Sequence, residues 1–195
     1  DVRKRNILAL ARRCHVSQTH ALHVAGLALR LFDQTTSLHG FGQREREWLE
    51  FAAILHDIGY LINSRQHHKH AYYLIKNSDL SGFTAEEIDL VANIARYHRR
   101  SVPTRKHSEF TALPEGNQRI INVLSALLRI ADGLDRSQFS VVRNVEVKIG
   151  KTVVITVDVS GDAELEIWAA RGRSDLFEKV FKRPVQFVTT SQEDE

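Results

Sequence analysis

The chain has 195 residues, of which 43% are hydrophobic and 26% are charged, and its formal net charge is +3. This is ordinary soluble-protein usage, so it argues against a disordered or membrane-embedded protein, and the small charge is no reason to expect a specific nucleic-acid binder. The longest apolar stretch, residues 120–131, is interrupted by Asn122 and Arg129 and falls well short of the roughly 20 residues that a membrane span needs.

The two sulfur-containing residue types have unusual counts. Cys14 is the only cysteine and cannot form an internal disulfide, so we expect a reducing, cytoplasmic compartment. Methionine is absent, even from position 1. We therefore expect the chain to be part of a longer polypeptide.

Apolar residues recur at helical spacing through the first 135 residues. They predict helices over residues 4–14, 17–37, 44–58, 68–77, 84–97 and 117–135. The helix from residue 84 begins with a capping box over residues 84–87. Gly59 is a typical helix terminator, so His56 and Asp57 are predicted to fall in the last turn before it. The segment 99–116 contains two of the chain's three prolines and is predicted to be a loop.

Near residue 140 the spacing of apolar residues changes from 3.6 to 2. From there the pattern predicts a β-hairpin of residues 142–149 and 153–159 and a third strand over residues 165–169. A short helix over residues 174–182 and a last strand over residues 184–189 follow. The final letters, SQEDE, are predicted to be a frayed acidic tail. The expected fold class is mainly α, with a helical domain over residues 1–139 and a small α+β subdomain over residues 140–195.

The histidines and aspartates of the helical region point to a metal site. All ten histidines lie at or before His107. His20, His56, Asp57 and Asp132 fall on three predicted helices, so they can converge inside a helical bundle. A divalent cation at a phosphate site needs nitrogen and oxygen ligands of this kind and an open position for water. The set therefore predicts metal-dependent hydrolytic chemistry.

Each of these residues also has a structural interpretation. A histidine on an apolar helix face is often a core residue whose hydrogen bonds are satisfied within the protein. Asp132 can serve as a buried cap or an ion-pair partner, and Asp135, one turn later, competes for its role. Three other histidines are predicted to lie at or near the surface: His15, His23 and His39.

Longer motifs resemble known families. The segments His20-Ala-Leu-His-Val-Ala, Leu55-His56-Asp57-Ile-Gly and Arg129-Ile-Ala-Asp132 occur in the order H…HD…D, which is similar to the HD superfamily of metal-dependent phosphohydrolases. The segments HHKHAYYLIKNSDLSGFT, ARYHRRSVP and LLRIADGLDRS resemble the C-terminal region of the exopolyphosphatase/guanosine-pentaphosphate phosphatase (Ppx/GppA) family. This resemblance extends over nearly the whole chain, including the small β-rich part.

The HD resemblance implies an HD-type helical bundle that binds one or two divalent ions, such as Mg²⁺, Mn²⁺ or another transition metal. It implies that the ligands of one ion are His20, His56, Asp57 and Asp132. In two-metal members Asp57 would bridge to a second ion, whose further ligands would be His98 and either His67 or His70. His56 and Asp57 would then carry the catalysis. Tyr60 departs from the pattern, because some two-metal phosphodiesterases have a lysine there.

Basic residues lie close to these ligands in the sequence. They can bind phosphate oxygens, and the candidates are Lys69, Arg99, Arg100 and Arg136, with Arg105 and Lys106 beside them. The structural alternative is a solvated basic face. Because the cluster flanks the candidate histidine ligands, we favour anion binding for it.

Two functions of different classes follow. The first is an HD-type phosphohydrolase that acts on the phosphoanhydrides or phosphate esters of polyphosphate or nucleotide polyphosphates. The alternative is a non-catalytic module that binds these polyanions and helps to form a homodimer. In the Ppx/GppA family the principal polyphosphate hydrolysis is assigned to an N-terminal actin-like portion, which this chain does not contain. Metal ligation separates the two, because a buried His/Asp set without an ion or a partner costs several kcal/mol in order of magnitude.

Overall fold

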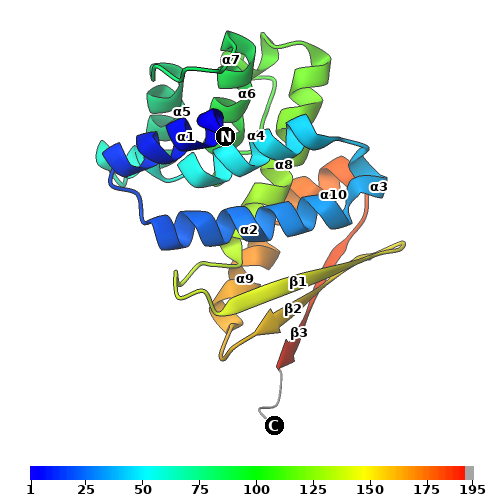
Figure 1. Ribbon diagram of the computed structural model, residues 1–195. Helices are drawn as coiled ribbons and strands as arrows, with labels where there is room; N and C mark the ends of the chain where they lie inside the picture. The colour runs from blue at the N-terminus through cyan, green and yellow to red at the C-terminus, as the bar shows by residue number, and fades with distance from the viewer. Residues whose placement is uncertain (192–195) are drawn as a thin grey trace.

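The computed structural model describes residues 1–191 and shows a mainly α-helical protein with a small three-stranded sheet (Figure 1). The helical part consists of α1 (Val2–Arg13), α2 (Gln18–Gln34), α3 (Thr36–His39), α4 (Gln43–Leu55), the 3-10 helix η1 (Ile58–Leu61), α5 (His67–Lys76), α6 (Ala85–Arg96), α7 (Ser108–Thr111) and α8 (Glu115–Gly133). The remaining elements are β1 (Val142–Ile149), β2 (Val153–Val159), α9 (Glu164–Gly172), α10 (Asp175–Phe181) and β3 (Val185–Ser191). The predicted fold class is therefore confirmed. Most of the predicted acidic tail lies outside the described residues.

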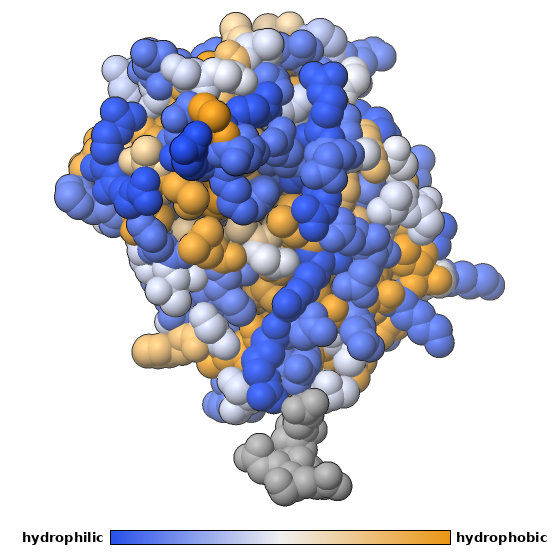
Figure 2. Space-filling view, in the orientation of Figure 1, coloured by the Kyte–Doolittle hydropathy of each residue, from blue (hydrophilic) through white to orange (hydrophobic). Residues whose placement is uncertain are grey.

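Within residues 1–191, none of the helices combines the length and the hydropathy that a bilayer span requires. The face of the molecule seen in Figure 1 is largely hydrophilic, with smaller apolar patches between the polar side chains (Figure 2).

Helix α2 connects the helical part to the sheet. It packs against α4 and α8 on one side and against β1 on the other, and Figure 1 shows it running between the other helices and the sheet. Its side chains Val24 and Leu31 are at most 1% exposed. The Gln34 side chain donates to the carbonyl of Val145 at 3.0 Å and accepts from the amide of Val147 at 2.8 Å. These bonds pair the end of α2 with the edge of β1.

The predicted third strand over residues 165–169 is wrong, because these residues form α9. β2 pairs antiparallel with β1 and parallel with β3, and the two helices α9 and α10 form the crossover between the parallel strands. Helix α9 buries Ile167 and Ala170, three positions apart, whereas Leu165 and Trp168 are 47% and 70% exposed. Burial therefore follows the helical period, although the apolar residues alternate in the sequence.

Several other boundaries differ from the predictions. The predicted helix 17–37 divides into α2 and α3, and the predicted loop 99–116 contains α7 and the first two residues of α8. The helix predicted over 44–58 ends at Leu55. His56 and Asp57 therefore lie just past the α-helical segment, where the backbone passes into η1.

Two glycines allow close packing beside these residues. A Cβ atom on Gly59 would lie 1.8 Å from the carbonyl oxygen of His67, so η1 packs directly on the start of α5. A Cβ atom on Gly133 would lie 2.9 Å from the backbone nitrogen of Ala170, so the end of α8 packs directly on α9. Any larger residue at either position would push two segments apart.

Candidate metal centre

The structure brings together the four residues that the sequence pattern singled out. His20 lies on α2, His56 caps α4, Asp57 follows it, and Asp132 lies in the last turn of α8. Nε2 of His20 lies 3.5 Å from Oδ2 of Asp57 and 3.4 Å from Oδ1 of Asp132. Nε2 of His56 lies 3.4 and 3.3 Å from the same two oxygens. Atoms that bind one ion at about 2.1 Å lie roughly 3.0–3.4 Å apart, so these atoms have the spacing of a ligand set.

A second group lies on the other side of Asp57. His67 begins α5 and His98 follows α6. Their Nε2 atoms lie 3.1 Å and 3.7 Å from Oδ1 of Asp57 and 3.1 Å from each other. The two oxygens of Asp57 thus face two different pairs of imidazoles. Of the two predicted alternatives, His67 is the residue at this group, whereas His70 lines a separate cavity with Ile62.

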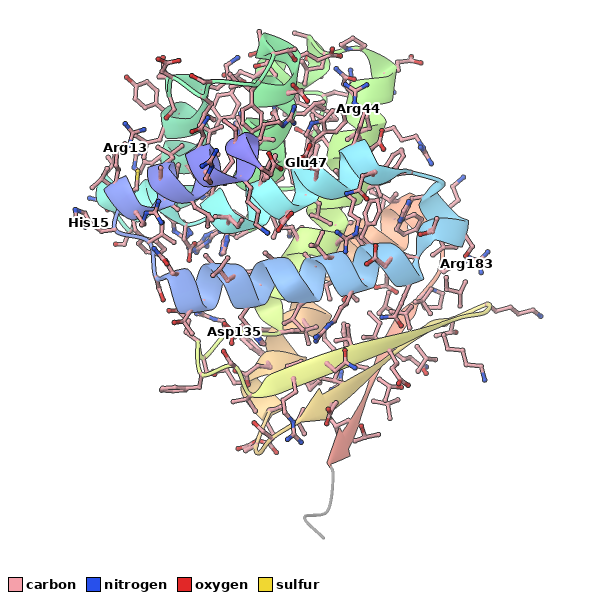
Figure 3. The ribbon with its side chains drawn as sticks, in the orientation of Figure 1. Arg13, His15, Arg44, Glu47, Asp135 and Arg183 are labelled. Atoms are coloured by element: carbon pink, nitrogen blue, oxygen red, sulfur yellow. The ribbon has the colours of Figure 1, made fainter. Side chains whose placement is uncertain are left out.

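Each of the four histidines is oriented through its Nδ1 atom. Nδ1 of His20 lies 2.6 Å from Oδ2 of Asp135. In the other three the partner is a backbone carbonyl three positions earlier: that of Ala53 for His56 at 2.6 Å, that of Ser64 for His67 at 3.3 Å, and that of Ala95 for His98 at 2.6 Å. Because a carbonyl oxygen only accepts, His56 and His98 carry a hydrogen on Nδ1 and turn Nε2 into the cluster. Metal-binding histidines are usually held in this way. Asp135 therefore does not compete with Asp132 but orients His20, from a place beside α2 (Figure 3).

Two of the four inward-facing nitrogen atoms have no hydrogen-bond partner among the described residues. Within residues 1–191, the buried Nε2 atoms of His20 and His56 make no hydrogen bond. Leaving such an atom unsatisfied costs about 1–3 kcal/mol. Two overlapping groups of three residues place their ligand atoms within 4.8 Å of one another: His20 with His56 and Asp132, and His56 with Asp57 and His98. These nitrogen and oxygen donors fit a divalent cation.

Burial and local charge shift the protonation of the cluster in opposite directions. Burial alone would raise the pKa of Asp57, but the neighbouring imidazoles, first that of His56, hold it well below its usual range. Burial alone would lower the pKa of His20, but the surrounding carboxylates, first that of Asp132, raise it to about 11. Burial, with the neighbouring His56, lowers the pKa of His98 well below its usual value. Binding a cation would therefore displace a proton from His20.

A cavity of about 30 Å³ opens beside the cluster and has arginines in its wall. This volume accommodates about two water-sized particles. Its basic residues are Arg99, Arg136 and Arg173. Arg173 also forms an ion pair with Oδ2 of Asp132. It was not predicted, because it follows a segment expected to be a strand and its local sequence does not distinguish it from the nearby Arg171.

The predicted phosphate-binding residues are not all at this cavity. Arg99 and Arg136 line it, whereas Lys69 and Arg100 are exposed and line a neighbouring cavity of about 340 Å³. Arg99 belongs to the walls of both cavities. Four of the basic residues predicted as one cluster therefore form two groups that share Arg99, whereas Arg105 and Lys106 line neither cavity.

The prediction that His39 lies at the surface is wrong. Its side chain is 3% exposed, its Nε2 donates to the carbonyl of Phe32 at 3.0 Å, and its Nδ1 accepts from the amide of Phe41 at 2.9 Å. Both ring nitrogens are satisfied, so the role of His39 is structural. His15 does lie at the surface, near the end of α1 (Figure 3).

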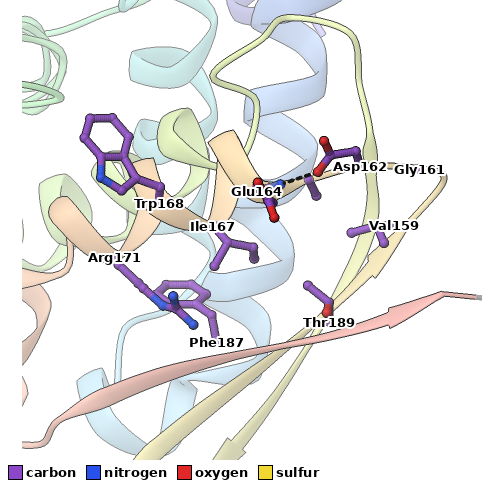
Figure 4. A pocket seen from close by; sticks show the side chains of 10 residues that line it. Val159, Gly161, Asp162, Glu164, Ile167, Trp168, Arg171, Phe187 and Thr189 are labelled. Atoms are coloured by element: carbon purple, nitrogen blue, oxygen red, sulfur yellow. Dashed lines mark hydrogen bonds between the residues drawn. The ribbon is translucent and has the colours of Figure 1, made fainter.

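A larger cavity, of about 600 Å³, lies between α9 and β3 (Figure 4). Its wall includes Ile167, Trp168, Arg171 and Phe187, and it shares no lining residue with the cavity beside the histidines. Its size exceeds that of the smaller cavity, but its lining contains no histidine. The donor set for a metal therefore lies at the smaller cavity.

Comparison with known proteins agrees with the motifs. Residues 2–159 match the family described as Ppx/GppA phosphatase, domain III. A relative, the guanosine-5'-triphosphate,3'-diphosphate pyrophosphatase of Pseudoalteromonas translucida (strain TAC 125), is 33% identical over 137 residues. The match covers 67% of this chain but only 26% of that protein, so the chain spans about a quarter of the relative's length. Because the family model matches most of the chain, the chain belongs to the Ppx/GppA phosphatase family and corresponds to its domain III.

Proposed function

We propose that this chain forms an HD-type, metal-dependent phosphohydrolase site. The observation that carries the proposal is the inward-facing pair of Nε2 atoms on His20 and His56. Within residues 1–191 they make no hydrogen bond, and they lie 3.3–3.5 Å from the oxygens of Asp57 and Asp132. What distinguishes this pair is that both nitrogens face the same two carboxylate oxygens, at the spacing of ligands around one ion.

The residues divide into two ligand groups. We assign one divalent ion to His20, His56, Asp57 and Asp132. Asp57 would bridge through its other oxygen to a second ion held by His67 and His98. Divalent ions at such a site supply Lewis-acid chemistry, which polarises a phosphoryl oxygen and makes water a stronger nucleophile.

The chain's own side chains orient the reacting groups. Asp57 lies between the pair His20 and His56 and the pair His67 and His98, and its two oxygens face one pair each. His56 is held by the carbonyl of Ala53. Arg99 and Arg136 place positive charge on the wall of the cavity, where it would neutralise phosphate oxygens. The chain thus positions a phosphoryl group between imidazole and guanidinium groups.

We propose phosphoanhydrides or phosphate esters of polyphosphate or nucleotide polyphosphates as the substrate class. Support comes from the family, which is described as a phosphatase family, and from the name of the relative, a guanosine-5'-triphosphate,3'-diphosphate pyrophosphatase. The exposed basic group of Lys69 and Arg100 continues outward from Arg99, which suits an extended polyanion.

We retain the division into a helical domain over residues 1–139 and a small α+β subdomain over residues 140–195 as a proposal. The family match runs to residue 159 and therefore extends past this boundary. Arg173, which pairs with Asp132, lies in the second part. The proposed site thus includes residues from both parts.

The experiment that tests this function measures bound metal and released phosphate on the same protein. The purified chain and its Asp57→Ala variant are loaded with Mn²⁺, dialysed and analysed for metal content, and then given inorganic tripolyphosphate and a nucleoside triphosphate. We expect stoichiometric Mn²⁺ and Mn²⁺-dependent release of phosphate from the original chain, and neither from the variant. Asp79→Ala, which changes an exposed aspartate, is the matched control.

Two outcomes would contradict the proposal in different ways. If neither protein holds Mn²⁺ or Mg²⁺, the His/Asp cluster is a structural core and the metal site is wrong. If the original chain holds metal but releases no phosphate from either compound, the site binds metal without hydrolysis, and the alternative of a polyanion-binding module replaces the enzyme.

A further inference from the structure

Arg173 reaches the proposed site from a part of the chain beyond the family match. It directly follows α9, whereas the match ends at residue 159. Its guanidinium pairs with Oδ2 of Asp132, and its side chain is 20% exposed and lines the cavity beside the histidines. It is therefore both anchored to a proposed ligand and accessible from the cavity.

The backbone around Arg173 is held by close packing. Gly133, next to Asp132 in the sequence, lets Ala170 approach the end of α8 directly. The hydroxyl of the buried Ser174 donates to the carbonyl of Ala170 at 2.8 Å. One turn before Asp132, the guanidinium of Arg129 donates to the carbonyl of Tyr97 at 3.1 Å and lies 3.5 Å from Asp175. The position of Arg173 thus follows from the packing of α9 and α10 on α8.

Asp132 divides its two oxygens between different groups. Oδ1 lies 3.4 Å from Nε2 of His20 and 3.3 Å from Nε2 of His56, whereas Oδ2 pairs with Arg173. A cation bound among the imidazoles would therefore contact Oδ1 of Asp132, while the guanidinium of Arg173 contacts Oδ2. Neither would displace the other. An anion with several oxygen atoms could contact both at once.

We propose that Arg173 binds a phosphoryl oxygen of the substrate, with Asp132 holding its guanidinium in place. The inference rests on the proposed metal-dependent function and adds a residue from the C-terminal elements to it. A guanidinium suits this role because it has five N–H donors in a rigid plane, so pairing with Asp132 leaves others free for phosphate. The helices α9 and α10 thus complete the binding site rather than merely covering α8.

Calorimetric titration tests the inference on the full chain. The affinity for Mn²⁺ is measured first, and the affinity of the Mn²⁺-loaded protein for inorganic phosphate second. In Arg173→Ala we expect phosphate affinity to fall about 10- to 100-fold, the value of a charge-assisted hydrogen bond or two, while Mn²⁺ affinity does not fall. Arg173→Lys should lie between, because it keeps the charge but loses the planar fork.

Arg171→Ala is the matched control. It removes the same charge two positions away, from a side chain that lines the other cavity, on the side of α9 turned towards β3 (Figure 4). It should leave both affinities unchanged.

The possible results separate this inference from the proposed function. Unchanged phosphate affinity in Arg173→Ala, with Mn²⁺ bound normally, would overturn the role of Arg173 alone. A parallel loss of Mn²⁺ affinity would also overturn it, because Arg173 would then support the ligands and not the phosphate. No binding of Mn²⁺ by the unaltered chain would overturn both proposals.

Discussion

Two polar clusters are buried in the same helical bundle, and they differ in how completely the groups at their centres are satisfied. At the junction of α1, α4 and α6, Glu87 accepts from Arg3 at 2.9 Å, from the indole of Trp48 at 3.2 Å and from the backbone of Thr84 at 3.0 Å. Its side chain is 8% exposed. In the His/Asp cluster, by contrast, the Nε2 atoms of two buried histidines find no hydrogen bond within residues 1–191.

The difference indicates what each cluster is for. Burial alone would raise the pKa of Glu87, but its hydrogen bonds from Thr84, Arg3 and Trp48 lower it to about 2. This carboxylate therefore stabilises the packing of three helices with no need of a ligand. The His/Asp cluster contains two buried imidazole nitrogens that make no hydrogen bond within residues 1–191, which is expected where a ligand completes the set.

The largest expected loss of stability is that of Gly59→Ala, which disturbs the backbone beneath the His/Asp cluster. The new Cβ would overlap the carbonyl oxygen of His67, a backbone atom that cannot move without shifting α5. We expect a loss of about 3 kcal/mol or more in the free energy of unfolding, measured with urea. Gly26→Ala is the control, because no atom lies within 4 Å of its added Cβ, and it should gain up to about 1 kcal/mol. Equal stabilities of the two variants would contradict the close packing.

Metal should stabilise the protein through the His/Asp cluster and not through the cluster around Glu87. At Mn²⁺ concentrations about 100 times the dissociation constant, we expect the free energy of unfolding to rise by about 2.7 kcal/mol. Glu87→Gln should show the same gain, and Asp57→Asn should show almost none. The measurement is urea unfolding with and without Mn²⁺. A gain that survives in Asp57→Asn would place the metal elsewhere.

Removing the charge of Glu87 should destabilise the protein in a pH-dependent way. We expect Glu87→Gln to cost about 2 kcal/mol at neutral pH, since hydrogen bonds to a charged group are lost. Because the pKa of Glu87 is lower in the folded state, its contribution is complete above the unfolded value of 4.5 and is lost as the pH falls towards about 2. Unfolding curves of both proteins from pH 7 to pH 2 should therefore converge. A constant difference would contradict the assigned shift.

The smallest effect is expected from Asp135→Asn. Its amide oxygen can still accept from Nδ1 of His20, but the charge that orients the imidazole is lost. We expect Mn²⁺ affinity to fall about 10-fold, at the lower end of the range for residues that hold a metal ligand. Calorimetric titration beside Asp79→Asn measures this. If both variants bind Mn²⁺ equally well, Asp135 has no part in orienting His20 for metal.

The helical part of the fold could be predicted from the sequence because its signals are local. Apolar residues at helical spacing and the capping box at Thr84 indicate helices wherever they occur, and Glu87 does complete that box in the structure. The α9 segment was mispredicted because the exposed Leu165 alternates with Ile167 and Ala169 in a pattern that imitates a strand. Only the packing of Ile167 against the rest of the protein reveals the helical face.

In the candidate site, too, some residues have a local sequence signal and others do not. The motifs around His20, His56 and Asp132 pointed to one another because their residue types and order are characteristic. Asp135, which orients His20, and Arg173, which pairs with Asp132, have no such signal, because an aspartate or an arginine near the end of a helix is common. The position of Arg173 depends on the close contact of α8 with α9 at Gly133, and that of Asp135 on the contact with α2, neither of which a local pattern encodes.

The cluster also bears on the order of events in folding. His20 and Asp135, which contact each other at 2.6 Å, are separated by 115 positions in the sequence. Because the entropy of closing so long a loop opposes such a contact, we expect it to form late in folding. A cation that needs both residues in place would then not act as a nucleus for folding. It would instead bind the finished structure and slow its unfolding, so that metal would lengthen the lifetime of the native state without hastening its formation.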